Sequence, residues 1–241
     1  LTTMENRLGT HLDLKIQFLI FNNLNDLKQS NIGLNADVNY NVGGVSYILG
    51  NKVVLYFDGS LINFEKQIRQ GLAHVLLQNA IFGGNITAQI LNSFLKNTPE
   101  WYSRGLISYL AKEWNTDIDD KIRNIILSGK FRKFSQLVMD ENKVVDAGHS
   151  FWKFVADVYG KENITEIINM TRVSRSVENG FMYALGVSLK TLYKDWYSHY
   201  YAKYYTLYYL YDNFPLYTLL FALVINPEVL HLLVLHNTSY F

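Results

Sequence analysis

The chain has no cysteine, only three prolines, and a formal net charge of just +1. The lack of cysteine excludes disulfides, thiolate zinc sites and a cysteine nucleophile. The small net charge gives no sign of the basic surface that nucleic-acid binding requires, so we expect no nucleic-acid partner. The sequence also contains no Gly-x-Ser-x-Gly elbow, no P-loop and no G-x-G-x-x-G turn. Serine hydrolases of the elbow type and the common nucleotide-binding folds are therefore not indicated.

The 241 residues, 49% of them hydrophobic, are enough for one two-lobed domain or two small ones. Eighteen residues are tyrosine, which suits half-wet interfaces because an apolar ring carries a polar hydroxyl. A simple compositional bias explains the same number equally well.

The last part of the chain differs in composition. No Lys or Arg follows Lys203, and residues 216–235 are mostly apolar. The tripeptide Asn226-Pro227-Glu228 interrupts this run, whereas a membrane-spanning helix needs about 20 uninterrupted apolar residues. We expect a tail at 204–241, of unknown role and outside the cooperative core, and do not favour membrane association through it.

Three short apolar runs of strand length come first, at residues 14–21, 45–49 and 52–57. Gly50-Asn51 between the last two predicts a hairpin. After residue 60 the hydrophobic period lengthens to that of a helix. The helices expected there cover residues 62–82, 86–95, 99–114, 117–127, 150–159, 162–170 and 187–201. Strands followed by helices predict an α+β fold, with a small N-terminal sheet packed on the long 62–82 helix and a helical lobe after it.

One helical segment carries residues with potential chemistry. It reads Ile68-Arg69-Gln70-Gly71-Leu72-Ala73-His74-Val75. In the zinc motif H-E-x-x-H, two histidines four residues apart bind the metal and the glutamate activates its water. Gln70 and Gly71 stand where the first histidine and the glutamate would be, and only His74 matches.

A second segment, Pro99-Glu100-Trp101-Tyr102-Ser103-Arg104-Gly105, continues with Tyr109. Together the two segments resemble the zinc helix and the downstream P-x-W-x-x-E-G-x-x-x-Y helix of gluzincin metallopeptidases of the peptidase-MA-like group. In that group the glutamate of the second helix is the third zinc ligand, but here the position is Arg104. A guanidinium cannot ligate a cation.

Further segments are similar to bacterial envelope proteins of this group, in which such a module precedes a TolB-like β-propeller. They include residues 117–129, 147–160 and 186–200, and the glycine-containing stretches 31–34 and 41–45. The resemblance implies a thermolysin-like domain over 1–203, with a sheet lobe at about 1–60 and a helical lobe at about 61–203. It also implies a pseudo-metallopeptidase of the Bacteroidetes periplasm or outer membrane, without metal or cofactor, that binds a peptide or protein partner. We expect His149, Trp101 and Tyr109 to line the cleft.

Each of these residues has a plainer interpretation. His74 on an apolar helix face is more often a hydrogen-bonded core histidine than a metal ligand, and Gly71 is a candidate site of close packing. We expect Arg104 to line the cleft beside His74 and to contact an acidic group or anion there, and its plainer interpretation is a pair with Glu100 one turn earlier. His149 is expected just before a helix, with Ser150 as its N-cap. Asp117, Asp119 and Asp120 lack the glycine and distal glutamate of a calcium loop and fit a helix N-terminus better.

The sequence is compatible with two other functions. One is a hydrolase with a non-standard metal site built from His74, His149 and a carboxylate. The other is a structural protein that associates with a membrane through its C-terminal tail.

Overall fold

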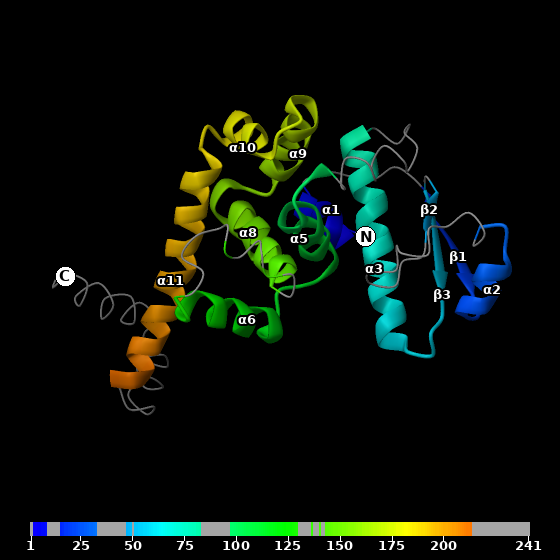
Figure 1. Ribbon diagram of the computed structural model, residues 1–241, viewed down its shortest axis with the longest axis horizontal. Coiled ribbons are helices and arrows are strands. Elements are labelled where there is room, and N and C mark those ends of the chain that lie inside the picture. Colours follow the sequence, from blue (N-terminus) through cyan, green and yellow to red (C-terminus); the bar gives the residue numbers. More distant parts are fainter. Residues whose placement is uncertain are drawn as a thin grey trace.

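A small sheet and a larger group of helices lie on opposite sides of the long helix α3, Leu61–Phe82 (Figure 1). The computed structural model describes residues 2–8, 15–32, 47–49, 51–82, 97–129, 136, 140 and 143–213. The chain is mostly helical with one small sheet, as expected for an α+β protein. The helix expected at 86–95 and the glycine turns at 43–44 and 83–84 lie outside the described residues.

The sheet has three strands in the order β1-β3-β2. Strand β1 is Gln17–Phe21, β2 is Tyr47–Leu49 and β3 is Lys52–Tyr56. Strands β2 and β3 pair antiparallel across a two-residue connection, which confirms the predicted hairpin, and β1 pairs parallel with β3. A short helix that we did not expect, α2 (Leu24–Gln29), follows β1. The side chain of Asn23 caps it by accepting a hydrogen bond from the backbone N–H of Asp26.

Helix α3 belongs to two hydrophobic clusters at once. Val75 packs with Val53 and Leu55 of β3, while Leu76 and Leu77 join the core of the helical lobe. The two sets point in different directions because neighbouring helical residues are about 100° apart around the axis. The predicted packing of the sheet on this helix is confirmed.

The helical lobe contains α1 (Thr2–Leu8), α5 (Glu100–Ala111), α6 (Thr116–Leu127), α8 (Val144–Tyr159), α9 (Glu162–Ser174), α10 (Val177–Leu185) and α11 (Leu189–Asn213). Helix α8 begins six residues before the expected start at Ser150. Helix α10 was not expected, although Ser176 caps its start and Gly186, with a φ of 70°, ends it.

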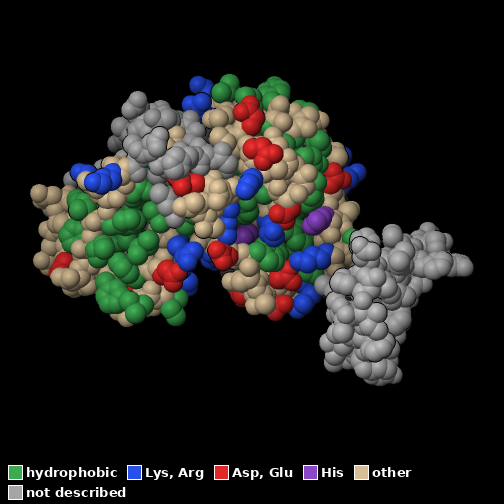
Figure 2. Space-filling model, turned by 180° about the vertical axis from the view of Figure 1, so that it is seen from behind, with side chains coloured by type: hydrophobic (Ala, Val, Ile, Leu, Met, Phe, Trp, Pro, Cys, Tyr) green, Lys and Arg blue, Asp and Glu red, His purple; other side chains and the backbone are tan. Residues whose placement is uncertain are grey.

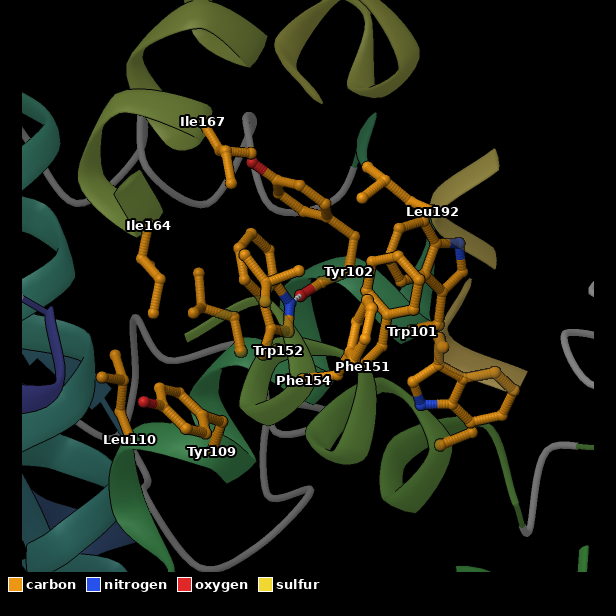
Figure 3. Packing of buried hydrophobic residues seen from close by; sticks show 14 of the residues in the cluster. Trp101, Tyr102, Tyr109, Leu110, Phe151, Trp152, Phe154, Ile164, Ile167 and Leu192 are labelled. Atoms are coloured by element: carbon orange, nitrogen blue, oxygen red, sulfur yellow. Dashed lines mark hydrogen bonds between the residues drawn. The ribbon is translucent and has the colours of Figure 1, made fainter. Parts of the chain in front are cut away.

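Aromatic side chains fill the core of this lobe (Figure 3). The indole Nε1 of Trp152 donates to the carbonyl of Tyr102 at 2.9 Å, and the Tyr102 hydroxyl lies 3.1 Å from Oγ1 of Thr171. The rings of Phe151 and Phe181 meet edge to face with centroids 5.7 Å apart. The polar ends of these large side chains are thus satisfied inside the core, which burial of Tyr and Trp requires.

Helices α5 and α8 touch through two glycines, Gly105 and Gly148. A Cβ added to Gly148 would lie 2.0 Å from the carbonyl oxygen of Trp101, and one added to Gly105 would lie 2.5 Å from the Cα of Gly148. Only glycine allows two helix backbones to approach this closely. The crossing places the aromatic residues of both helices in one core.

Helix α1 packs in the helical lobe, although we had assigned residues 1–60 to the sheet lobe. Its Met4 and Leu8 are buried in the same cluster as α5, α8 and α9. The guanidinium of Arg7 donates to the carbonyls of Tyr109, Leu110 and Lys112, the last at 2.7 Å. These carbonyls lie at the C-terminal end of α5, where the helix itself leaves acceptors unpaired. The Arg7 side chain therefore caps the C-terminal end of α5.

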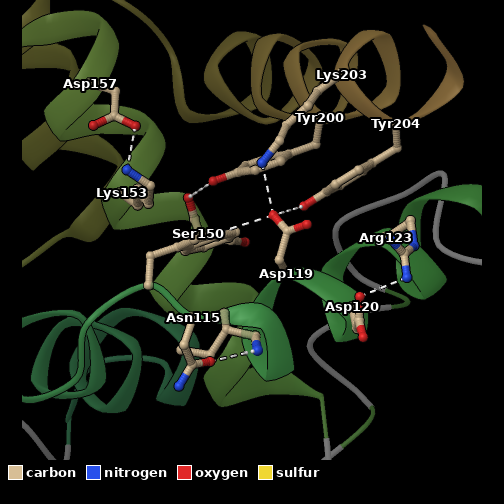
Figure 4. A network of polar contacts seen from close by, with 12 residues as sticks. Asn115, Asp119, Asp120, Arg123, Ser150, Lys153, Asp157, Tyr200, Lys203 and Tyr204 are labelled. Carbon is tan, nitrogen blue, oxygen red and sulfur yellow. Dashed lines mark hydrogen bonds and ion pairs between the residues drawn. The ribbon is translucent and has the colours of Figure 1, made fainter. Parts of the chain in front are cut away.

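Helix α11 continues past the expected boundary at Lys203. Tyr204 is only 1% exposed, and its hydroxyl donates to Asp119 at 3.0 Å. Asp119 also accepts from Nζ of Lys203 at 2.8 Å and from Nε1 of Trp114 at 3.0 Å (Figure 4). The core thus extends beyond Lys203, at least to Tyr204. None of the helices in the described part of the chain combines the length and apolarity needed to cross a membrane.

Candidate functional site

The three motif positions on α3 differ in environment. Gln70 and His74 are half-buried, whereas Gly71 is buried. A Cβ added to Gly71 would lie 2.3 Å from a methyl carbon, Cγ1, of Val53 on β3. Contacts this short do not occur between real side chains, so any side chain at Gly71 would require Val53 or the helix to shift. The packing interpretation of this glycine is confirmed.

His74 is held as a neutral imidazole. Burial lowers its pKa from the usual 6.5 to about 4. At neutral pH its ring therefore offers one donor and one acceptor, with no charge.

Arg104 forms the surface pair. Its Nη1 lies 3.1 Å from Oε2 of Glu100, one turn earlier on α5. Both side chains are about half exposed, at 41% and 54%. Of the two alternatives for Arg104, the structure thus shows the contact with Glu100. Exposed pairs of this kind contribute only tenths of a kcal/mol, roughly 0.3–0.5.

His149 lies inside α8, which corrects the expectation that it precedes the helix with Ser150 as N-cap. The helix begins at Val144, and Gly148 within it lies at the crossing with α5. The side chain of His149 is 1% exposed, and its Nδ1 is 3.1 Å from Oγ of Ser108 on α5. Burial, followed by the charges of Lys112, Arg7 and Lys153, lowers the pKa of His149 to about 3.

The other residues expected in a cleft are also inside the protein. Trp101 is 2% exposed and packs edge to face on Phe151, with centroids 5.2 Å apart. Tyr109 is 8% exposed beneath the guanidinium of Arg7, and burial raises its pKa to about 12. Both contribute to the core of the helical lobe. Their burial is typical of aromatic residues on the apolar face of an amphipathic helix.

The acidic cluster at the start of α6 behaves as expected for a helix N-terminus. Asn115 caps the helix by accepting from the N–H of Ile118 at 3.0 Å. Asp117 pairs with Lys121 at 2.8 Å, and Asp120 with Arg123. No three His, Asp or Glu side chains of the described ranges come together as a metal site would need.

Sequence reasoning missed Gln67, which stands one turn before Gln70. It is 2% exposed, and its Oε1 is buried without a hydrogen-bond partner among the residues that the structure describes. The spacing of Gln67, Gln70 and His74 puts them on one side of α3, between the side that faces β3 and the side that faces the helical lobe. We call these three residues the polar stripe. The spacing is visible in the sequence, but the burial of Gln67 is not.

The outer end of the sheet lobe exposes apolar side chains. Ile20 on β1 is 55% exposed, and Leu61 and Ile62 at the start of α3 are 77% and 70% exposed. The backbone N–H of Phe57 donates to the carbonyl of Phe21, so the ends of β1 and β3 and the start of α3 are neighbours. Figure 2 shows hydrophobic side chains gathered over this lobe.

Comparison with known proteins adds no relative: no family model, no curated protein and no solved structure matches this chain.

Proposed function

We propose that this chain is a peptidase-like module without catalytic activity, and that it binds a peptide or protein partner in the bacterial cell envelope. The placement in the periplasm or at the outer membrane follows the resemblance to peptidase-MA-like envelope proteins. The observation that carries the proposal is the contact between Gly71 and Val53.

In the zinc motif, the residue after the first histidine is the glutamate that activates water. At Gly71 even a methyl group would overlap the side chain of Val53. A glutamate would need a backbone shift between α3 and β3 or a smaller residue at Val53. The packing of helix on sheet therefore supports the proposed absence of a general base at this position.

The other two motif positions support the same view. Gln70 cannot supply the imidazole of the missing ligand, and Arg104 is a fixed cation engaged with Glu100. With three of the four motif residues replaced, the polar stripe and the exposed apolar residues of the sheet lobe are what the region offers a partner. Both features suit the binding of a peptide that the protein does not cleave.

Zinc content tests the catalytic half of the proposal. Protein purified without chelator is analysed by inductively coupled plasma mass spectrometry and assayed for hydrolysis of an unfolded protein. We expect neither stoichiometric zinc nor hydrolysis. One zinc per chain that disappears in His74→Ala would overturn the proposal.

The steric argument is tested by a double-mutant cycle of Gly71→Ala and Val53→Ala. Gly71→Ala alone should lower the free energy of unfolding by about 1–3 kcal/mol through overpacking. With Val53→Ala present, the same change should cost nothing or even stabilise, because alanine favours a helix by about 1 kcal/mol over glycine. A cost that is equal in both backgrounds would mean that the position has room.

Binding is tested by selecting peptides from a phage-displayed random library on the immobilised chain. The affinity of synthetic versions is then measured by calorimetry. We expect sequences that bind the folded protein and do not bind it after thermal unfolding. A selection that yields no such peptide would count against a peptide-binding role.

A further inference from the structure

Helix α3 carries a buried polar atom that pairs with none of the described residues. Oε1 of Gln67 is buried without a hydrogen-bond partner among the described residues, while the side chain as a whole is 2% exposed. Buried carbonyl groups are nearly always hydrogen-bonded, because an unpaired one lowers stability. An apolar side chain of similar size at this position would remove that penalty. The unpaired carbonyl therefore points to a hydrogen-bond donor outside the described residues.

The rest of the polar stripe has the same chemical character. Gln70 and His74 lie one and two turns further along the same side of α3 and are half-buried, so they are partly accessible. The charged residues of this helix, Glu65, Lys66 and Arg69, fall on other sides by their spacing. Burial keeps the imidazole of His74 neutral, with a pKa of about 4. The stripe thus presents hydrogen-bonding groups and no charge.

A side-chain amide is the natural complement of a peptide group. Its carbonyl accepts from a peptide N–H and its NH₂ donates to a peptide carbonyl. Two glutamines separated by one turn lie about 5 Å apart along the helix axis, which is within the spacing between alternate residues of an extended chain. A charged ligand would find no opposite charge here, so the stripe favours backbone amides over carboxylates, phosphates or cations.

We propose that the polar stripe is the hydrogen-bonding wall of the binding site, and that it holds an extended peptide segment through its backbone amides. Gln67 forms the closed end of the site, and its carbonyl accepts a peptide N–H. For this contact the Gln67 amide must turn toward Gln70, the more accessible residue one turn later. This inference rests on the proposed peptide-binding function and adds to it the class of group that is recognised.

Gln67→Leu separates this role from a structural one. If the carbonyl serves only a ligand, the leucine variant should melt about 2–4 °C higher, because a buried unpaired group has been removed. The same variant should bind the phage-selected peptides about tenfold more weakly, which corresponds to 1.4 kcal/mol. Gln70→Leu should weaken binding with little change in melting temperature. Lys66→Leu, on another side of α3, is the matched control and should leave the affinity unchanged.

Backbone N-methylation of the peptide gives a second, independent measurement. Methylation of the residue whose N–H meets Gln67 should weaken binding to the wild-type chain about tenfold and have no further effect on Gln67→Leu. This experiment stays informative if a variant folds poorly, because the loss of affinity on methylation is measured with the wild-type protein.

The outcomes also separate this inference from the proposed function. Peptides that bind with equal affinity to the wild type and to both leucine variants would overturn the role of the stripe and leave peptide binding intact. A selection that yields no binding peptide would overturn both. Concentration-dependent self-association that is lost in Gln70→Leu would show that the stripe meets a second copy instead.

Discussion

Gly148 on α8 rests directly on the backbone of Trp101 on α5, so close that an added Cβ would lie 2.0 Å from the carbonyl oxygen. The neighbour is backbone and not a flexible side chain, so it cannot move aside without shifting the helix. The relative position of α5 and α8, and with it the aromatic core, depends on this contact.

Gly148→Ala should therefore lower the free energy of unfolding by about 3 kcal/mol, at the upper end of overpacking effects. The loss would occur although alanine is the better helix former by about 1 kcal/mol. Urea denaturation followed by circular dichroism measures it. Ala202→Gly, at an exposed site of α11, is the control for helix propensity alone and should cost about 1 kcal/mol. An alanine at 148 that is neutral or stabilising would show that the helices can separate.

The stability of the protein should fall on acidification, in part because of His149. Its pKa is about 3 in the folded chain and near the usual 6.5 in the unfolded chain, so the unfolded state takes up the proton first. The contribution is complete above about pH 6.5 and is lost as the pH falls toward about 3, with a total on the order of 5 kcal/mol. His74, whose pKa is lowered to about 4, acts in the same direction.

His149→Asn tests this dependence because an amide oxygen can still meet Ser108 but does not titrate in this range. The variant should be less stable at neutral pH, since it leaves a cavity, and its stability should change less between neutral and acidic pH. His199→Asn, on a more exposed position of α11 where burial also lowers the pKa of the histidine, should change the slope in the same direction but by less than His149→Asn. An unchanged slope in His149→Asn would contradict the burial of a neutral ring.

Tyr204 should be worth far more to stability than its neighbours on α11. Its ring is 1% exposed and its hydroxyl is bonded to Asp119, whereas Tyr205 is 48% exposed. Tyr204→Ala should cost about 3 kcal/mol, in the range of large aromatic truncations in a core. Tyr205→Ala, with a ring that only stacks on Tyr201, should cost less than about 1 kcal/mol.

The same contact predicts the result of truncating the chain. A protein that ends at Lys203 lacks the Tyr204 ring and should melt at a clearly lower temperature than one that ends at Thr206. Equal melting temperatures for the two truncated proteins would restore the boundary that the sequence suggested.

The pair of Glu100 and Arg104 should contribute little. In a double-mutant cycle with alanine at each position, we expect a coupling energy of about 0.5 kcal/mol or less that decreases with added salt. An Arg104→Ala cost above about 1.5 kcal/mol that is independent of Glu100 would reveal a second contact of the guanidinium, as in the cleft hypothesis.

Local signals in the sequence were sufficient for much of the fold. The strands, the two-residue hairpin and the long helix α3 follow from periodicity over neighbouring residues, and each is confirmed. Helices α2 and α10 were missed because they are short, although Asn23 and Ser176 mark their starts. The beginning of α8 was missed because Gly148-His149-Ser150 resembles a loop. The glycine is there to admit the backbone of α5, which no local pattern reveals.

The candidate site, too, could be predicted from the sequence only in part. Packing at Gly71 was one of the alternatives that the sequence left open, but the identity of its neighbour, Val53, requires the fold. The partners of Asp119 are Lys203 and Tyr204, 84 and 85 residues away, and they were beyond any spacing argument. The interpretation of the motif as that of a peptide-binding pseudo-metallopeptidase stays a prediction, which the zinc and binding experiments test.

The long-range hydrogen bonds of α1 have a consequence for the order in which the protein folds. Arg7 bonds to carbonyls 102 to 105 residues later in the chain, and the carbonyl of Leu8 accepts from Thr165, 157 residues later. A seven-residue helix is not stable alone in water. As the chain is synthesised, residues 2–8 cannot form these bonds until α5 and α9 have emerged, so their docking onto those helices is a late event. Folding should therefore be slower than the helical content suggests.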